Sequence, residues 1–267
     1  MFTYKDWEDF SNYLISINRF VLDDRRKEIV KEIIKLAKQN EDVIKKDEVF
    51  WRARINNNEL KIVNKELIRV PYTQKEMMNP PSDVVRGGRA NPPGITYLYA
   101  SDEIETAIAE AKPYLNAKID LLSIKLKKDI KVIDIQKYKR GETLLSLTIK
   151  EIDNLWFGIQ LSFAVPLPPD DKFGYIPTQY LAELFKNNGY DGIIYGSVQR
   201  ENFRNLVIFD RTNIEPGRME ERDVRSIEYI DNVGHLKKKK EEDPKRKKLM
   251  QQAMGIMIQK KNMGGDK

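Results

Sequence analysis

The segment Gly87–Glu110 restricts the possible fold most strongly, because it combines turn, strand and helix signals within 24 residues. Five glycines and prolines punctuate residues 87–94, which predicts a turn or loop around Arg89. Residues 95–100 alternate as a strand does, so that Tyr99 lies on one of its two faces. The segment therefore begins as a basic loop that leads into a short strand.

A helix is predicted directly after this strand. Apolar residues recur at helical spacing from Ile104 to Ala111, and Ser101 or Asp102 is expected to cap the N-terminus. Glu110 lies at the edge of the apolar stripe. One compact loop–strand–helix unit thus brings together a guanidinium, a phenol ring and a carboxylate, which makes it the candidate functional site.

The net charge of +6 is concentrated at the end of the chain. Residues 236–267 carry 11 of the 47 Lys and Arg residues and 4 of the 41 Asp and Glu residues, a balance of +7, which leaves −1 for the rest. A globular nucleic-acid-binding domain would carry basic residues on its folded surface. We therefore expect no nucleic-acid partner, except through this Lys-rich tail, whose composition predicts disorder.

Missing residue types exclude much of the usual catalytic chemistry. The chain has no cysteine and one histidine, His235, which excludes Ser-His-Asp triads, Cys-His pairs and the common zinc sites. Neither of the two common Gly-rich nucleotide-binding motifs, G-x-x-x-x-G-K-[ST] and G-x-G-x-x-G, occurs in the sequence. Any chemistry must rest on Arg, Tyr, Glu, Asp, Ser, Thr or Lys, in a reaction that needs no proton donor poised near neutral pH. We expect no metal site.

The hydropathy pattern indicates a cytoplasmic protein. No segment approaches the roughly 18 apolar residues of a transmembrane helix, and the N-terminus does not resemble a signal peptide. The lack of cysteine agrees with a reducing compartment, although only as weak support. We expect a cytoplasmic location and no contact with a membrane.

We expect an α+β fold in three parts. Residues 1–48 form a helical N-terminal extension of two amphipathic helices, which either supports the fold or docks a partner. Residues 49–212 form a single domain that holds the candidate site. Residues 213–267 form a C-terminal extension without clear periodicity, Lys-rich and disordered from about residue 236.

Hydrophobic patterns predict the elements of the second part. Strands are expected over residues 49–55, 119–126, 130–135, 190–195 and 205–209, and helices over 142–165 and from about Pro177 to Gly189. The lysines of the second and third strands predict solvated sheet edges. In the first strand, Arg52 and Arg54 share a face, where they either reach water or contact a phosphate.

An ordered set of motifs along the chain resembles the RES domain family, which is named for its Arg, Glu and Ser and known for bacterial toxins that destroy NAD⁺. Any one motif is weak support, whereas the ordered set is strong. The motifs are Trp51-Arg52-Ala53-Arg54, Gly88-Arg89-Ala90-Asn91-Pro92-Pro93-Gly94, Tyr97-Leu98-Tyr99, Thr106-Ala107-Ile108-Ala109-Glu110, Pro177-Thr178-Gln179-Tyr180, Gly189-Tyr190-Asp191-Gly192-Ile193-Ile194-Tyr195, Ser197 and Asn205-Leu206-Val207-Ile208-Phe209.

The resemblance implies a fold like that of the ADP-ribosyltransferases, with two small sheets packed around an NAD-binding cleft, and cleavage of the nicotinamide–ribose bond. It assigns catalytic roles to Arg89, Tyr99, Glu110 and Ser197, and NAD⁺ contacts to Arg52, Arg54, Arg89 and Tyr99. Many members carry two serines after the Gly-Tyr-Asp-Gly strand. Here Gly196 takes the place of the first serine. The assignment of Ser197 therefore holds only if the functional serine of the family is the second one.

The implied chemistry suits the residue types available. Nicotinamide leaves NAD⁺ as a neutral molecule, so no general acid is needed, unlike at an ordinary glycoside. Glu110 would stabilise the developing oxocarbenium ion, and arginines would hold the diphosphate. Tyr99 would stack on nicotinamide or shape its pocket, and Ser197 would bond its amide or the ribose. The acceptor is water, inorganic phosphate or a macromolecule.

Three classes of function follow. The first is an NAD⁺ glycohydrolase or phosphorylase that depletes NAD⁺ as a toxin or defence effector, restrained by a neutralising antitoxin, with NAD⁺ as substrate and no other cofactor. The second is an ADP-ribosyltransferase that modifies a protein or nucleic acid. The third is a non-catalytic binding module that uses the basic tail and would bind in a salt-dependent manner.

Overall fold

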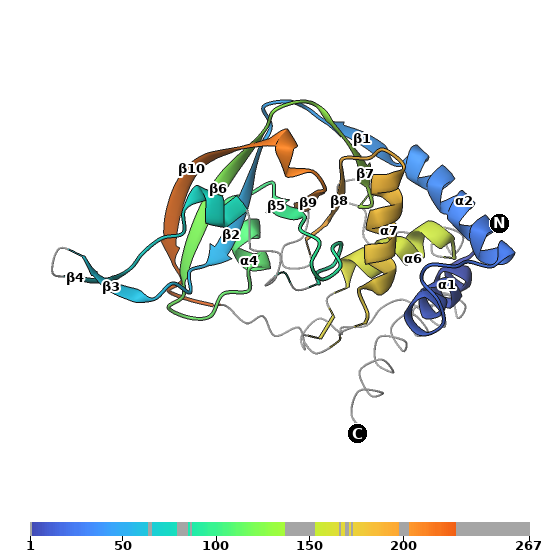
Figure 1. Cartoon of the computed structure of the whole chain (residues 1–267), viewed down its shortest axis with the longest axis horizontal. Helices are drawn as coiled ribbons and strands as arrows, with labels where there is room; N and C mark the ends of the chain where they lie inside the picture. The colour runs from blue at the N-terminus through green and yellow to red at the C-terminus, as the bar shows by residue number, and fades with distance from the viewer. Residues whose placement is uncertain are drawn as a thin grey trace, which may run out of the picture.

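The computed structural model describes residues 2–63, 66–78, 85, 87–136, 153–165, 167–168, 171, 173–197 and 203–227. The expectations for the basic tail, for His235 and for a helix before residue 153 lie outside these ranges. The described part confirms an α+β fold, with helices packed around a central mixed sheet (Figure 1).

Eight strands form the sheet in the order β1-β7-β8-β9-β5-β2-β6-β10. A separate hairpin projects away from the sheet in Figure 1. The strands of the sheet are β1 (Glu41–Ile44), β2 (Val49–Ile55), β5 (Leu98–Ser101), β6 (Lys118–Leu126), β7 (Ile130–Asp134), β8 (Gly192–Gly196), β9 (Arg204–Ile208) and β10 (Ile214–Asp223), and those of the hairpin are β3 (Leu60–Val63) and β4 (Glu66–Arg69).

The sheet has one narrow junction, where β2 meets β5. These strands pair only at Trp51 and Ser101, whereas all seven residues of β2 pair with β6 and all four of β5 pair with β9. The sheet therefore consists of a three-stranded portion, β2-β6-β10, and a five-stranded portion, β1-β7-β8-β9-β5. The resemblance implies two small sheets, whereas in the structure this junction joins the two portions into one eight-stranded sheet.

Four of the helices cover the five-stranded portion on the side drawn at the right of Figure 1, and α4 lies beside β2. No described helix has the length and apolar character needed to cross a membrane. The helices are α1 (Tyr4–Ser16), α2 (Asp24–Gln39), α3 (Gln74–Met78), α4 (Ile104–Glu110), α6 (Leu155–Ala164) and α7 (Ile176–Asn187), of which α1, α2, α6 and α7 form the covering group.

The two N-terminal helices share the main hydrophobic core. Trp7 and Phe10 of α1 and Ile33 of α2 are almost completely buried together with residues of α6, α7 and the sheet. Side chains at i, i+3, i+4 and i+7 produce this apolar face, as the sequence pattern predicts. Helices α1 and α2 are therefore packed into the domain as part of its core.

Several local expectations are wrong. The lysine-bearing strand β6 is not an edge, because β2 and β10 flank it and its residues 119–124 are buried. The sheet also does not end at residue 212 as expected, because β10 pairs with β6 and extends the sheet to residue 223. Neither Ser101 nor Asp102 caps α4: Ser101 still belongs to β5, and Asp102 accepts a hydrogen bond from the backbone N–H of Arg204.

Candidate active site

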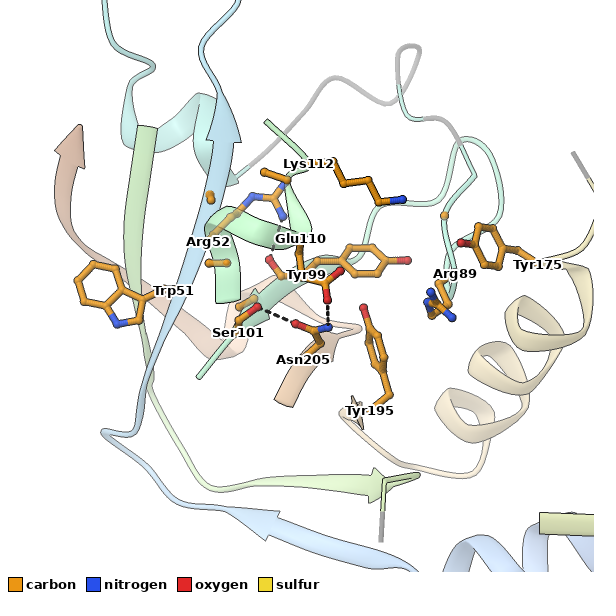
Figure 2. A pocket seen from close by; sticks show the side chains of 15 residues that line it. Trp51, Arg52, Arg89, Tyr99, Ser101, Glu110, Lys112, Tyr175, Tyr195 and Asn205 are labelled. Carbon is orange, nitrogen blue, oxygen red and sulfur yellow. Dashed lines mark hydrogen bonds between the residues drawn. The ribbon is translucent and has the colours of Figure 1, made fainter. Parts of the chain in front are cut away.

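A cavity of about 300 Å³ opens beside the junction of the two sheet portions, between α4 and the loop before β5 (Figure 2). This volume is at the lower end of the usual range for ligand pockets. It is lined by Trp51, Arg52, Ala53, Gly88, Arg89, Tyr99, Ala100, Ser101, Ala107, Glu110, Ala111, Lys112, Tyr175, Tyr195 and Asn205. The candidate loop–strand–helix unit therefore contributes much of one cavity.

One row of paired residues crosses the strands that border the cavity. Ser101 of β5 lies opposite Asn205 of β9, and Asn205 lies opposite Tyr195 of β8. Residues directly opposite one another in a sheet project from the same face. The register of three strands therefore brings these side chains to the cavity together.

Glu110 is the last residue of α4, and its carboxylate meets this row (Figure 2). Its Oε1 accepts hydrogen bonds from Ser197 Oγ and Asn205 Nδ2, each at 2.7 Å. Its Oε2 accepts no hydrogen bond from the residues that the structure describes. Negative charge at a helix C-terminus is unfavourable, so this carboxylate is not placed there to stabilise the helix.

Ser197 donates a hydrogen bond to Glu110 and is not among the residues that line the cavity. It follows β8 directly, and its backbone N–H donates to Phe203 O at 2.9 Å, which fixes its position beside β9. Its hydroxyl then reaches Glu110. The Ser197 hydroxyl therefore contacts the carboxylate, and the expected contact between this serine and a substrate amide or ribose stays a prediction.

Tyr99 secures the loop that carries Arg89. Its hydroxyl accepts hydrogen bonds from the backbone N–H groups of Ala90 and Asn91, at 2.9 and 3.3 Å, and donates to Asn91 Oδ1 at 2.7 Å. Burial raises the pKa of Tyr99 to about 12, so the phenol stays protonated at neutral pH. The ring is available to a ligand, whereas the hydroxyl is occupied by the loop.

Gly88→Ala is expected to lower the free energy of unfolding by about 1–3 kcal/mol, as overpacking typically does. A Cβ at this position would lie 2.6 Å from Asn91 Oδ1 and 2.9 Å from the Tyr99 hydroxyl. Gly87→Ala is the matched control, because its nearest contact would be 3.1 Å, to a Pro93 ring atom. Urea denaturation of both variants measures the difference, and equal losses would contradict this packing account.

Arg89 lines the cavity while it caps the end of α6. Its Nη1 donates to the carbonyl oxygens of Ser162 and Val165, at 3.4 and 3.0 Å, and to that of Phe163. Its guanidinium lies 5.3 Å from the ring centre of Tyr175 and 5.6 Å from that of Tyr195. The positive charge therefore complements the negative end of the α6 dipole and is held between two aromatic rings.

The two arginines of β2 differ in their access to the cavity. Arg52 Nε donates to Met77 O at 2.8 Å and its Nη1 to Tyr99 O at 3.0 Å, whereas Arg54 Nη1 donates to Glu76 O at 3.1 Å. Both therefore bind carbonyl oxygens at the C-terminal end of α3. Only Arg52 lines the cavity, because Arg54 lies over the ring of Tyr72, 4.1 Å from its centre.

Arg52 retains a charge that no described carboxylate neutralises. It forms no ion pair among the described residues, and its hydrogen-bond acceptors are backbone carbonyls. Burial, together with the nearby Arg54, lowers the pKa of Arg52 to about 10, which leaves it cationic at neutral pH. A half-buried guanidinium beside a cavity, with no ion pair among the described residues, is suited to bind an anion.

Sequence reasoning did not identify several residues of the site. Asn205 and Tyr195 fall within the recognised motifs, where a polar residue at the start of an apolar strand was a usable signal for Asn205. Tyr175 borders the cavity just before α7, and the exposed Lys112 follows α4 and extends above Tyr99 in Figure 2. Neither of these two carries a local signal of function.

The RES domain family matches residues 66–230, more than half of the chain, and the protein therefore belongs to this family. The matched region begins after β2, so Arg52 and Arg54 lie outside it. No curated protein matches significantly. Among solved structures, a chain in the crystal structure of the M. tuberculosis MbcT–MbcA toxin–antitoxin complex is 14% identical, with a TM-score of 0.42 over 77% of this chain and 99% of that one.

Proposed function

We propose that this protein cleaves the nicotinamide–ribose bond of NAD⁺, with water or inorganic phosphate as the acceptor. One observation carries the proposal: a carboxylate stands in an aromatic cavity with one oxygen fixed and the other without a described partner. Glu110 is therefore oriented so that its negative charge can stabilise positive charge on a bound ligand. It makes no ion pair among the described residues that would neutralise its charge.

The proposed reaction needs a negative charge close to the ribose, which this carboxylate provides. The C–N bond to the ribose breaks with both electrons passing to nicotinamide, which leaves as a neutral molecule and requires no proton donor. Positive charge develops on the ribose, and Glu110 stabilises it at close range in a site with a low dielectric constant. A hydroxide equivalent from water, or a phosphate oxygen, then completes the ribosyl product.

The remaining cavity residues suit the rest of a dinucleotide. Arg52 is the candidate for diphosphate contact, because its charge is unpaired among the described residues and borders the cavity. The rings of Tyr99, Tyr175 and Tyr195 offer aromatic surface for nicotinamide. A cavity of about 300 Å³ receives one end of the dinucleotide, and the other end would extend toward solvent.

The biological role that we propose is that of a toxin or defence effector, restrained by a neutralising protein encoded with it. Family membership supports this role. Expression of the full chain in a bacterial host should lower the cellular NAD⁺ pool before growth stops, and Glu110→Gln should remove both effects. Growth arrest at an unchanged NAD⁺ level would contradict the proposed role.

Arg52→Met is expected to raise the KM for NAD⁺ by about 10- to 100-fold, since a hydrogen bond to a charged group contributes about 1.5–3 kcal/mol. Arg54→Met is the matched control. Both side chains bind carbonyls at the end of α3, so both variants should lose similar stability, whereas only Arg52 borders the cavity. Steady-state kinetics with equal KM values for the two variants would remove Arg52 from the diphosphate site.

A further inference from the structure

Asn205 is the buried polar residue of β9, a strand whose next three residues are apolar. Its side chain is 3% exposed, and Leu206, Val207 and Ile208, which complete β9, are all almost fully buried. A buried amide is costly unless its polar atoms are hydrogen-bonded. The identity of its partners therefore shows what this residue does in the sheet.

The partners of Asn205 fix which way its amide points. Ionised Glu110 can only accept hydrogen bonds, so the nitrogen Nδ2 must face it, as it does at 2.7 Å. The amide oxygen then faces Ser101, whose hydroxyl donates to it at 2.7 Å. Ser101 and Asn205 lie opposite each other in the β5–β9 ladder, so the sheet itself holds this contact in place.

We propose that Asn205, oriented by Ser101, is the positioning residue for the Glu110 carboxylate. This inference rests on the proposed function and extends it to residues with no assigned role. Asn205 joins Ser197 in holding Oε1. Oε2 is thereby left to face a ribose that binds in the cavity. The rigid β5–β9 ladder thereby sets the direction from which negative charge meets the developing cation, as the preorganisation of a catalytic group requires.

The kinetic test compares variants that change Asn205 with little change in shape. Asn205→Leu removes both N–H donors, and Asn205→Asp places a second acceptor beside Glu110. Each should lower kcat by about 10- to 100-fold with the KM for NAD⁺ changed less than about threefold, because the lost contact acts mainly in the transition state. Ser101→Ala, which only frees the amide to rotate, should lower kcat by about three- to tenfold.

Leu206→Val is the matched control for damage to the strand. Leu206 is the next residue of β9, is 1% exposed and does not line the cavity. This variant should lose stability and keep wild-type kcat. A similar fall in kcat for Leu206→Val, or unchanged kcat in both Asn205→Asp and Ser101→Ala, would overturn the inference.

A structural readout separates this inference from the proposed function. Release of nicotinamide by the wild-type protein tests the function alone. Crystal structures of the wild type and of Asn205→Asp test the positioning, whether or not NAD⁺ is the substrate. We expect the Glu110 carboxylate to leave its wild-type position in the variant, and an unmoved carboxylate would overturn the inference.

Discussion

Glu110→Gln is expected to lower the turnover of NAD⁺ by about 10³-fold or more, because it removes the negative charge that faces the developing cation. The amide oxygen of the glutamine can still accept hydrogen bonds from Ser197 and Asn205, so the local structure should be retained. Stability should change by less than about 1 kcal/mol, since loss of a negative charge at a helix C-terminus is slightly favourable. Initial rates and thermal melts of the purified variant measure both quantities.

Glu105→Gln provides the control for this change. Glu105 lies on the same helix but is exposed and does not border the candidate cavity. Its neutral variant should keep wild-type turnover. Wild-type turnover in Glu110→Gln would instead show that the carboxylate takes no part in the reaction, and the assignment of the active site would fail.

Phe10→Ala is expected to lower the free energy of unfolding by about 3–5 kcal/mol, the usual cost of removing a large aromatic side chain from a core. Phe10 is 1% exposed and packs edge-to-face against Tyr180 of α7, with ring centres 5.6 Å apart. Chemical denaturation measures the loss. A variant that lacks residues 1–40 should fail to fold for the same reason, because the core would lose all the buried side chains of α1 and α2.

Phe20→Ala is the control at an exposed position. Phe20 belongs to the same N-terminal region but is 94% exposed, so its replacement should change the stability by no more than about 0.5 kcal/mol. Equal stability of Phe10→Ala and wild type would show that the N-terminal helices are an independent appendage.

The N-terminal helices also connect with the candidate site through α6. Trp7 Nε1 donates to Ser162 Oγ at 2.8 Å, and its ring covers Gly158, where an added Cβ would approach it to 2.5 Å. The C-terminal end of that helix, in turn, accepts hydrogen bonds from Arg89. Destabilisation of α1 should therefore loosen the anchor of the Arg89 side chain in the cavity wall.

The sequence allowed the prediction of elements that carry their own hydrophobic pattern. The two N-terminal helices, the strand at residues 49–55 and the helix α7 occur where expected. β10 was not predictable in this way, because six of its ten residues are charged and it is held by backbone pairing with β6. The central place of β6 also depends on this partner, since its lysines at 118 and 125 are exposed while the residues between 119 and 124 are buried.

The candidate site was predictable where one local segment supplies the residues. Arg89, Tyr99 and Glu110 lie within one loop–strand–helix unit, and all three border the cavity. The contacts of Asn205 were not predictable, because they depend on the register between β9 and β5, whose contacting residues Asn205 and Ser101 are 104 positions apart in the sequence. The different positions of Arg52 and Arg54 were likewise not predictable, because only Arg54 lies over the ring of Tyr72.

The most direct test of the account is incubation of the purified full-length chain with NAD⁺, with and without inorganic phosphate, followed by product analysis by mass. The account predicts free nicotinamide together with ADP-ribose, or with its phosphorylated counterpart when phosphate is the acceptor. Release of nicotinamide with label found only on a macromolecule would assign ADP-ribosyl transfer instead. Intact NAD⁺ under both conditions would contradict the proposed reaction.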